Sequence, residues 1–162
     1  MTANKGIWLS LALGLAAFAL DRLHKYLQVD LYHWPEGYFH PLTPFFDVGL
    51  VFNPGISYGL LNSLPLWAIA ILVAVALCAL VVWWWRATSR LVRAGLAICI
   101  GGAASNALDR AIYGQVADFF HFHIGDWSFY IFNIADAAIT LGVGLLLLDL
   151  LGIGSKRAAN PA

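Results

Sequence analysis

Charged residues and cysteines are scarce in this chain of 162 residues. Asp, Glu, Lys and Arg together make up 11% of the sequence, and nine basic residues balance nine acidic ones. So low a charge content is not typical of a soluble domain, and the lack of a basic excess argues against a nucleic-acid partner. The two cysteines, Cys78 and Cys99, both fall within apolar runs. An external disulfide framework is therefore not expected, and both thiols are interpreted as structural.

Long hydrophobic runs are what the chain has instead. Hydrophobic residues account for 61% of the sequence, and the mean hydropathy is +0.77. A helix that crosses a bilayer needs about 20 apolar residues. Four stretches approach this length: Ile7–Leu20, Leu64–Trp85, Leu91–Leu108 and Phe132–Ile153. The sequence predicts an all-α membrane protein with four transmembrane helices, in which residues 1–162 form a single domain and the first helix continues through Lys25.

Basic residues are distributed unevenly between the loops. The segments 28–63 and 114–131 contain no Lys or Arg, whereas the other flanks of the apolar runs carry Lys5, Arg86, Arg90, Arg93, Lys156 and Arg157. Because cytoplasmic loops are enriched in Lys and Arg, we expect both termini in the cytoplasm and the two segments without basic residues outside. An alternative interpretation treats residues 1–19 as a cleaved signal peptide, which would leave three spans.

The first external segment, residues 28–63, is long for a compact four-helix protein. Its prolines and glycines disfavour a continuous helix, and its aromatic and β-branched residues favour short strands. Long ordered loops are often functional. We expect this segment to form a small β-rich, aromatic cap that lies over the bundle and roofs a site.

A polar stripe follows one face of the third predicted helix. Gly102, Asn106, Arg110 and Gly114 recur every four residues and therefore line the same face near its external end. The glycines permit close backbone approach, and the two polar side chains can donate hydrogen bonds to a substrate backbone or to a carboxylate. An alternative is that they only bridge neighbouring helices.

Two aspartates flank the second external segment. Asp118 follows the third predicted helix, and Asp136 lies on the first turn of the fourth, three residues after Asn133. Carboxylates near the hydrocarbon boundary are costly unless they pair, bind an ion or transfer protons. Two adjacent carboxyls cannot both ionise cheaply, so one can act as a base towards water while its protonated partner polarises a peptide carbonyl. This chemistry requires no metal or cofactor. For each acid alone, an ion pair or a helix cap remains the alternative.

Other polar residues have simpler interpretations. Asp21 and Lys25, at i and i+4, are predicted to form an ion pair at the end of the first helix. Asp109 is interpreted as structural, and Asp149 is expected to lie near Lys156 or Arg157. A metal site formed by Asp118 with the nearby His121 and His123 is a less favoured alternative, because a His-x-His pattern is generic.

Five ordered motifs resemble the bacterial lipoprotein signal peptidases, also called type II signal peptidases. The motifs are Asp21 to Lys25, Asn53-Pro54-Gly55-Ile56-Ser57-Tyr58-Gly59, Gly101-Gly102-Ala103-Ala104-Ser105-Asn106-Ala107-Leu108-Asp109-Arg110, Val116-Ala117-Asp118-Phe119, and Phe132-Asn133-Ile134-Ala135-Asp136. The resemblance spans nearly the whole chain. Pro54 and Tyr58 depart modestly from the family pattern, and His121 follows the first aspartate motif; none of these differences removes a catalytic group.

The resemblance implies specific roles. Asp118 and Asp136 would form the catalytic dyad, and Asp21 with Lys25 would support the first external loop. The residues implied around the substrate are Asn53, Gly55, Asn106, Arg110 and Asn133. The implied enzyme is a monomeric, multi-pass protein of the bacterial inner membrane with its site towards the outer face. Its substrate would be a membrane prolipoprotein already modified with diacylglycerol and cut on the amino side of the lipidated cysteine.

Two other classes of function use the same polar residues. A small transporter or channel is disfavoured because Leu64–Trp85 is apolar and the acids gather at one end, whereas a conducting route needs polar groups throughout its depth. A noncatalytic lipoprotein-binding protein is disfavoured by the presence of both aspartates together with Asn106 and Asn133.

Overall fold

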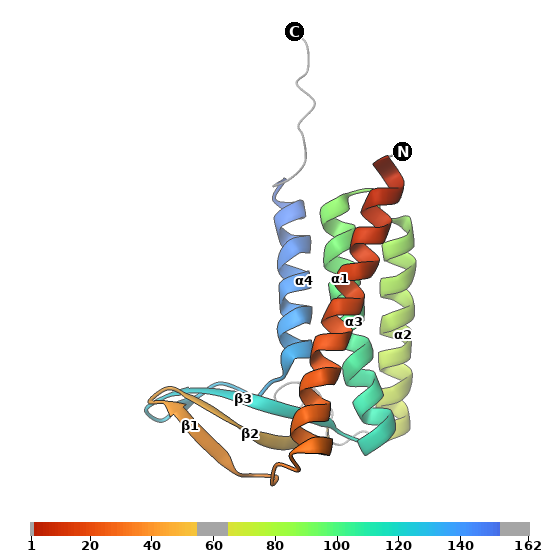
Figure 1. Cartoon of the computed structure of the whole chain (residues 1–162). Helices are drawn as coiled ribbons and strands as arrows, with labels where there is room; N and C mark the ends of the chain where they lie inside the picture. The colour runs from red at the N-terminus through yellow and green to blue at the C-terminus, as the bar shows by residue number, and fades with distance from the viewer. Residues whose placement is uncertain (1, 55–64, 153–162) are drawn as a thin grey trace.

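Within the part of the chain that the structure describes, the fold consists of four long helices and a small antiparallel sheet. The computed structural model describes residues 2–54 and 65–152, with side chains from Gly6 onward. The helices are α1 (Thr2–Lys25), α2 (Leu66–Arg86), α3 (Arg90–Tyr113) and α4 (Ile134–Leu150). They run side by side as a bundle, and the sheet projects sideways from one end (Figure 1). The start of α1 and the end of α4 lie at the opposite end.

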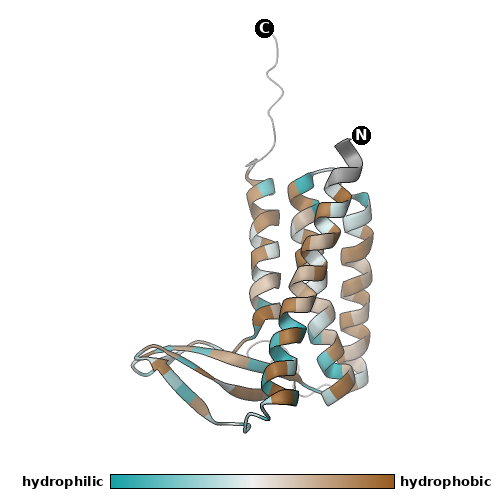
Figure 2. Ribbon diagram, in the orientation of Figure 1, coloured by the Kyte–Doolittle hydropathy of each residue, from teal (hydrophilic) through white to brown (hydrophobic). Residues whose placement is uncertain are grey.

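Three of the four long helices in the described part of the chain have the length and composition of membrane spans. Within the described residues, three helical segments are long and apolar enough to cross a membrane: Gly6–Leu31, Leu66–Arg86 and Arg90–Tyr113. Helix α4 is also apolar, but with 17 residues it is shorter than the other three long helices. The fourth run predicted from the sequence ends at Ile153, outside the described residues. Exposed apolar side chains cover much of α2, where Ile69 alone is buried. Figure 2 shows that hydrophobic residues predominate along α2, and its exposed apolar side chains are suited to contact with lipid rather than water.

Helix α1 ends at Lys25, as the sequence predicts, but the chain stays helical beyond it. Beyond Lys25 the chain continues as a short π-helical segment, η1 (Tyr26–Leu31), in which the N–H of Tyr32 donates to the carbonyl of Leu27 at 2.9 Å. The first external segment was predicted to begin near Gln28, so the helical chain extends a few residues further into it. This extension carries Val29 to the sheet, where it packs against the buried core of the cap.

The predicted cap is a four-stranded sheet, but the first external segment does not form it alone. Strands β1 (Phe39–Thr43) and β2 (Phe46–Asn53) come from that segment, and β3 (Val116–Ile124) and β4 (Trp127–Ser128) come from the second one. Their order is β1-β2-β3-β4 with antiparallel neighbours. Leu50, Ala117 and Phe119 form its buried core. Pairing of β2 with β3 therefore joins two segments that lie far apart in the sequence.

Close helix packing depends on glycines at the centre of the bundle. Helix α3 packs against each of the other three helices. A Cβ atom added at Gly14 of α1 would lie 2.7 Å from the carbonyl oxygen of Ala97 on α3. Such a contact is far inside van der Waals distance, so only glycine permits this separation of α1 and α3. The α1–α3 interface in turn fixes the end of α1 against the polar residues of α3.

Replacing Gly14 with alanine is expected to destabilise the bundle. The added methyl group must push α1 away from Ala97, and overpacking of this kind costs about 1–3 kcal/mol. Thermal unfolding of the detergent-solubilised protein should show a lower midpoint for Gly14→Ala. Gly144→Ala is the matched control, because nothing lies within 4 Å of a Cβ at that position. An equal loss in both variants would contradict the proposed close approach.

Candidate active site

One asparagine side chain joins the two aspartates that the sequence singled out. Asp118 lies on β3 and is 3% exposed, and Asp136 lies on the first turn of α4. The Nδ2 of Asn133 donates to Asp118 Oδ1 at 2.7 Å, while its backbone N–H donates to Asp136 Oδ2 at 3.2 Å. Asn133 thus links β3 to the start of α4, and these two elements carry the two aspartates.

The position of Asp136 follows from how α4 begins. Asn133 is the N-cap residue, and its Oδ1 accepts a hydrogen bond from the backbone N–H of Asp136 at 2.9 Å. With the reciprocal bond from Asn133 N to the Asp136 carboxylate, the two residues form a capping box. The helix-cap interpretation of Asp136 is therefore correct. It does not exclude chemistry, because the same carboxylate also lines a cleft.

Asp118 is held by two amide donors. Its Oδ2 accepts a hydrogen bond of 3.2 Å from Asn53 Nδ2 on β2, in addition to the bond from Asn133. Burial, and then the nearby negative charge of Asp136, raise the pKa of Asp118 to about 7, although both amide bonds act in the opposite direction. Asp118 can therefore keep a proton close to neutral pH, whereas an ordinary carboxyl would be ionised.

Asn106 connects the aspartates to a buried cation. Its Nδ2 donates to Asp136 Oδ1 at 2.9 Å, and its Oδ1 accepts from Lys25 Nζ at 2.9 Å and from Asn133 Nδ2 at 3.1 Å. The two interpretations of the polar stripe on α3 are thus both correct for this residue. It bridges helices and also contacts one of the two acids.

Lys25 is fully buried among oxygen atoms. Its Nζ lies 2.8 Å from Asp21 Oδ2 and 2.6 Å from Asp109 Oδ2, in addition to Asn106. The ion pair predicted between Asp21 and Lys25 is present. A second cation, Arg22, pairs with Asp109. Two buried carboxylates are therefore balanced by two cations, which is the condition for keeping charges in an apolar environment.

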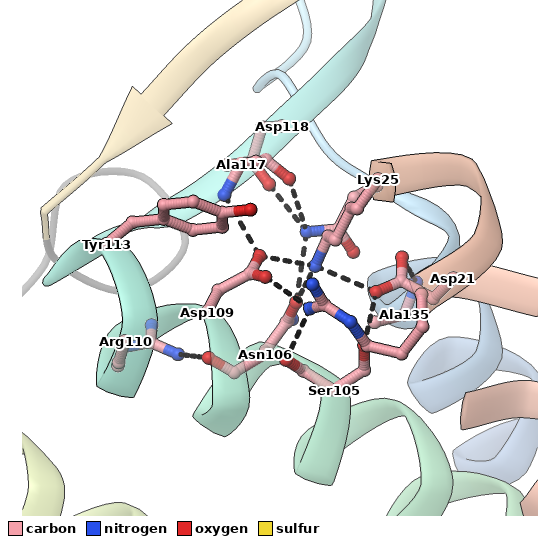
Figure 3. A network of polar contacts seen from close by, with 12 residues as sticks. Asp21, Lys25, Ser105, Asn106, Asp109, Arg110, Tyr113, Ala117, Asp118 and Ala135 are labelled. Atoms are coloured by element: carbon pink, nitrogen blue, oxygen red, sulfur yellow. Dashed lines mark hydrogen bonds and ion pairs between the residues drawn. The ribbon is translucent and has the colours of Figure 1, made fainter. Parts of the chain in front are cut away.

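Each of these ion-paired acids also holds the backbone next to one of the two site acids. Asp109 Oδ2 accepts a hydrogen bond of 3.1 Å from the N–H of Ala117, which precedes Asp118. Asp21 Oδ1 accepts one of 2.8 Å from the N–H of Ala135, which precedes Asp136. Figure 3 shows these contacts converging around Lys25. The network thus positions both site aspartates through their neighbours in the chain.

Sequence reasoning missed several members of this network. Asp109 was interpreted only as structural, and neither Arg22 nor Ser105 was assigned a role. The hydroxyl of Ser105 donates to Asp21 Oδ2 at 2.6 Å. A usable signal was present, since Ser105 and Asp109 lie four residues apart on α3 and so share one face, as Asp21 and Lys25 do on α1.

A cleft of about 210 Å³ opens over the two acids. Its polar lining consists of Asn53, Asn106, Arg110, Asp118, Tyr130 and Asp136, and its other walls are apolar side chains, half of them from α2. Arg110 donates from Nη1 to the carbonyl of Asn106 at 3.1 Å. Of the predicted substrate-binding residues, Asn53, Asn106 and Arg110 line the cleft, Asn133 links the acids, and Gly55 lies outside the described residues.

An apolar cavity of about 470 Å³ adjoins this cleft between α2 and α3. The two share Val73, Leu77 and Arg110 as lining residues. The neighbouring cavity is otherwise lined by Leu66, Trp67, Ala70, Ala74, Ala107 and Ala111. The acids thus lie beside a hydrophobic space that can receive lipid-like groups.

Comparison with known proteins assigns the family. The model of the family described as signal peptidase (SPase) II matches residues 13–152. The chain belongs to the signal peptidase II family. Similar proteins include the lipoprotein signal peptidases of Beijerinckia indica, 44% identical with 92% of each chain covered, and Methylocella silvestris, 46% identical over 93% of this chain and 92% of the other.

A solved structure supports the same conclusion about the fold. A bacterial membrane enzyme determined by the in meso method at 2.3 Å resolution superposes with a TM-score of 0.81 and 26% sequence identity. The match covers 96% of this chain and 95% of the other. The arrangement of helical bundle and lateral sheet is therefore shared with a known membrane enzyme, and this chain is a bacterial membrane peptidase of the signal peptidase II family.

Removing the charge of Lys25 is expected to unfold this end of the bundle. In Lys25→Met, Asp21 and Asp109 would lose a buried partner, and breaking a buried pair costs roughly 3–5 kcal/mol. Thermal unfolding in detergent should show a large drop in the midpoint. Arg86→Met removes an exposed cation at the end of α2 and serves as control. A midpoint for Lys25→Met that matches this control would contradict the role assigned to the network.

Proposed function

We propose that this chain is an aspartyl endopeptidase that removes the signal peptide from diacylglyceryl-modified prolipoproteins. The cut falls on the amino side of the lipidated cysteine. The observation that carries the proposal is the pair of Asp118 and Asp136, joined through Asn133 at the floor of a cleft beside an apolar cavity. Relatives named lipoprotein signal peptidase support the substrate class.

Asp118 and Asp136 divide the proton transfers between them. Asp118, whose pKa is raised to about 7, starts in the protonated form and polarises the scissile carbonyl. Asp136 starts as the carboxylate and takes a proton from the attacking water. Once the tetrahedral intermediate has formed, this proton passes to the leaving amine as the carbon–nitrogen bond breaks. Asp136 is thereby left as the carboxylate, and Asp118 recovers from the carbonyl oxygen the proton that it shared with it as the intermediate collapses, so the cycle needs neither a metal nor a cofactor.

The remaining polar residues hold the peptide. Asn53 on β2 and Arg110 on α3 line the cleft, where their N–H groups can donate to substrate carbonyls. Asn106 and Asn133 act mainly on the acids, and Gly55 is proposed to approach the substrate backbone. The apolar cavity between α2 and α3 accepts the acyl chains of the lipidated cysteine, which can enter sideways from the bilayer.

All four helices cross the bacterial inner membrane in this proposal, with both termini in the cytoplasm. The 17 described residues of α4 span about 25 Å, close to the ~30 Å hydrocarbon thickness, and the predicted run continues to Ile153. The absence of Lys and Arg from residues 114–131 supports placing the sheet and cleft on the outer side. Residues 1–162 then act as one monomeric domain, with 28–63 as the larger part of its cap.

Cleavage should require both aspartates. Asp118→Asn and Asp136→Asn each remove a proton-transfer group with little change in size, so the rate should fall at least about 100-fold. The assay follows cleavage of a diacylglyceryl-modified prolipoprotein on gels, with folding checked by thermal unfolding. Asp126→Asn, at the exposed turn between β3 and β4, is the control and should cleave normally. Normal cleavage by either folded dyad variant would refute the aspartyl mechanism.

The pH dependence tests which acid starts protonated. If Asp118 must carry a proton, kcat/KM should fall as pH rises through about 7, by about tenfold per unit beyond it. The direction follows because the raised pKa keeps the protonated form dominant only below that value. Initial rates at low substrate concentration give the profile. A kcat/KM that increases across the same interval would instead make Asp118 the base.

Chemical labelling can test the orientation. A cysteine introduced as Asp126→Cys should react in spheroplasts with a maleimide that does not cross membranes, because the sheet lies outside. Thr88→Cys, in the exposed turn between α2 and α3, should react only after permeabilisation. Both variants are made in a Cys78→Ala background. The reverse labelling pattern would overturn the proposed topology.

A further inference from the structure

A second cluster of polar side chains lies on the cap sheet, outside the cleft. Asp47 is near the start of β2, and His121 and His123 are two residues apart on β3. Residues two apart on a strand face the same side, and Asp47 is paired directly with His121 across the β2–β3 ladder. All three side chains therefore gather on one face. The turn between β1 and β2, next to Asp47 in the chain, lies at the end of the sheet that points away from the bundle (Figure 1).

The ligand atoms have the spacing of a metal site. Asp47 Oδ2 lies 3.4 Å from His121 Nδ1 and 3.1 Å from His123 Nε2, and the three atoms are all within 4.8 Å of one another. Ligands around a tetrahedral Zn²⁺ at its usual bond lengths are about 3.3 Å apart. The side chains are 18–27% exposed, so an ion could reach them while most of its surroundings remain protein.

The hydrogen bonds of His121 also favour a metal site at this position. Its Nε2 lies 2.6 Å from Ser128 Oγ, and the Ser128 hydroxyl donates its single hydrogen to the carbonyl of Phe129 at 3.2 Å. With that hydrogen used, Ser128 Oγ can accept a hydrogen bond from His121 Nε2–H. In this tautomer of the neutral imidazole the lone pair is on Nδ1, which lies 3.4 Å from Asp47 Oδ2. Two electron-rich atoms face each other, an arrangement that a cation between them would stabilise.

His123 also places a ring nitrogen close to the carboxylate of Asp47. Its Nε2 is buried and has no hydrogen-bond partner among the described residues, although Asp47 Oδ2 is only 3.1 Å away. The contact has the distance of an ion pair but not the direction of a hydrogen bond. The two imidazole rings stack with centroids 5.2 Å apart and planes inclined by 28°. Both rings thus present a nitrogen to the same carboxylate oxygen.

We propose that Asp47, His121 and His123 form a site for a divalent transition metal, with Zn²⁺ as the occupant that fits the two nitrogens and one oxygen best. Water would complete a tetrahedral coordination. The Ser128 hydroxyl orients His121 from the outer shell, as the second nitrogen of a metal-bound histidine usually requires. The bound ion ties β2 to β3 across the tip of the cap. It is separate from the aspartates of the cleft and takes no part in their proton transfers.

Metal binding can be measured without any peptidase assay. The full chain, purified in detergent with its affinity tag removed and stripped with a chelator, is dialysed against ZnCl₂ and its bound zinc is counted. We expect about one Zn²⁺ per chain for the native protein, since one ligand set is present. His121→Gln and His123→Gln should each lose this zinc. Substituting Co²⁺ should give the visible absorption of a tetrahedral site in the native protein only.

Two further variants separate a built site from incidental binding by surface histidines. His40→Gln removes an exposed histidine of β1 on the same sheet and should bind zinc like the native protein. Ser128→Ala keeps all three ligands but loses the outer-shell bond, so its zinc affinity should fall by about tenfold or more. Zinc uptake that is equal in the native protein and in the His121→Gln and His123→Gln variants, or absent from all of them, would overturn the proposal. The result does not depend on whether the chain cleaves prolipoproteins.

Discussion

The buried ammonium group of Lys25 is the interaction on which the rest of the site depends. It lies between Asp21 on its own helix and Asp109 on α3, at 2.8 and 2.6 Å. Each of these acids uses a carboxylate oxygen to hold a backbone N–H, that of Ala135 for Asp21 and that of Ala117 for Asp109. One cation therefore couples the start of α4 and the start of β3, which are the two elements that supply the site aspartates.

Aspartates have two different roles in this structure, and the groups that contact each carboxylate determine its role. Asp21 and Asp109 contact cations directly, so their charges are balanced and they serve as anchors. Asp118 accepts hydrogen bonds from neutral amides and lies close to another acid, so burial and repulsion raise its pKa to about 7. A charge-balanced network thus positions a second pair of acids, and in this pair the pKa of Asp118 is raised. Asn106 connects the ion-pair network to the site aspartates, because it forms hydrogen bonds with both Lys25 and Asp136.

Sequence patterns predicted the local features and missed the long-range ones. Apolar runs, the i,i+4 pair of Asp21 with Lys25, and the position of Asp136 at a helix start all depend on residues close together in the chain. Pairing of β2 with β3 joins residues about 70 positions apart, such as Asp47 and His121, and its register depends on packing that a single sequence does not display. For that reason the histidines were considered with Asp118, which is near in sequence, although the structure groups them with Asp47.

The central claim is that Asp118 keeps a proton near neutral pH because it is buried beside Asp136. Infrared difference spectroscopy of the detergent-solubilised protein can follow the carbonyl band of protonated carboxyl groups as the pH is raised, with Asp118→Asn used to assign the band. The account predicts a carboxyl that loses its proton near pH 7 in the native protein and is missing from Asp118→Asn. An Asp118 that is already ionised at pH 5, as an ordinary aspartate is, would contradict it.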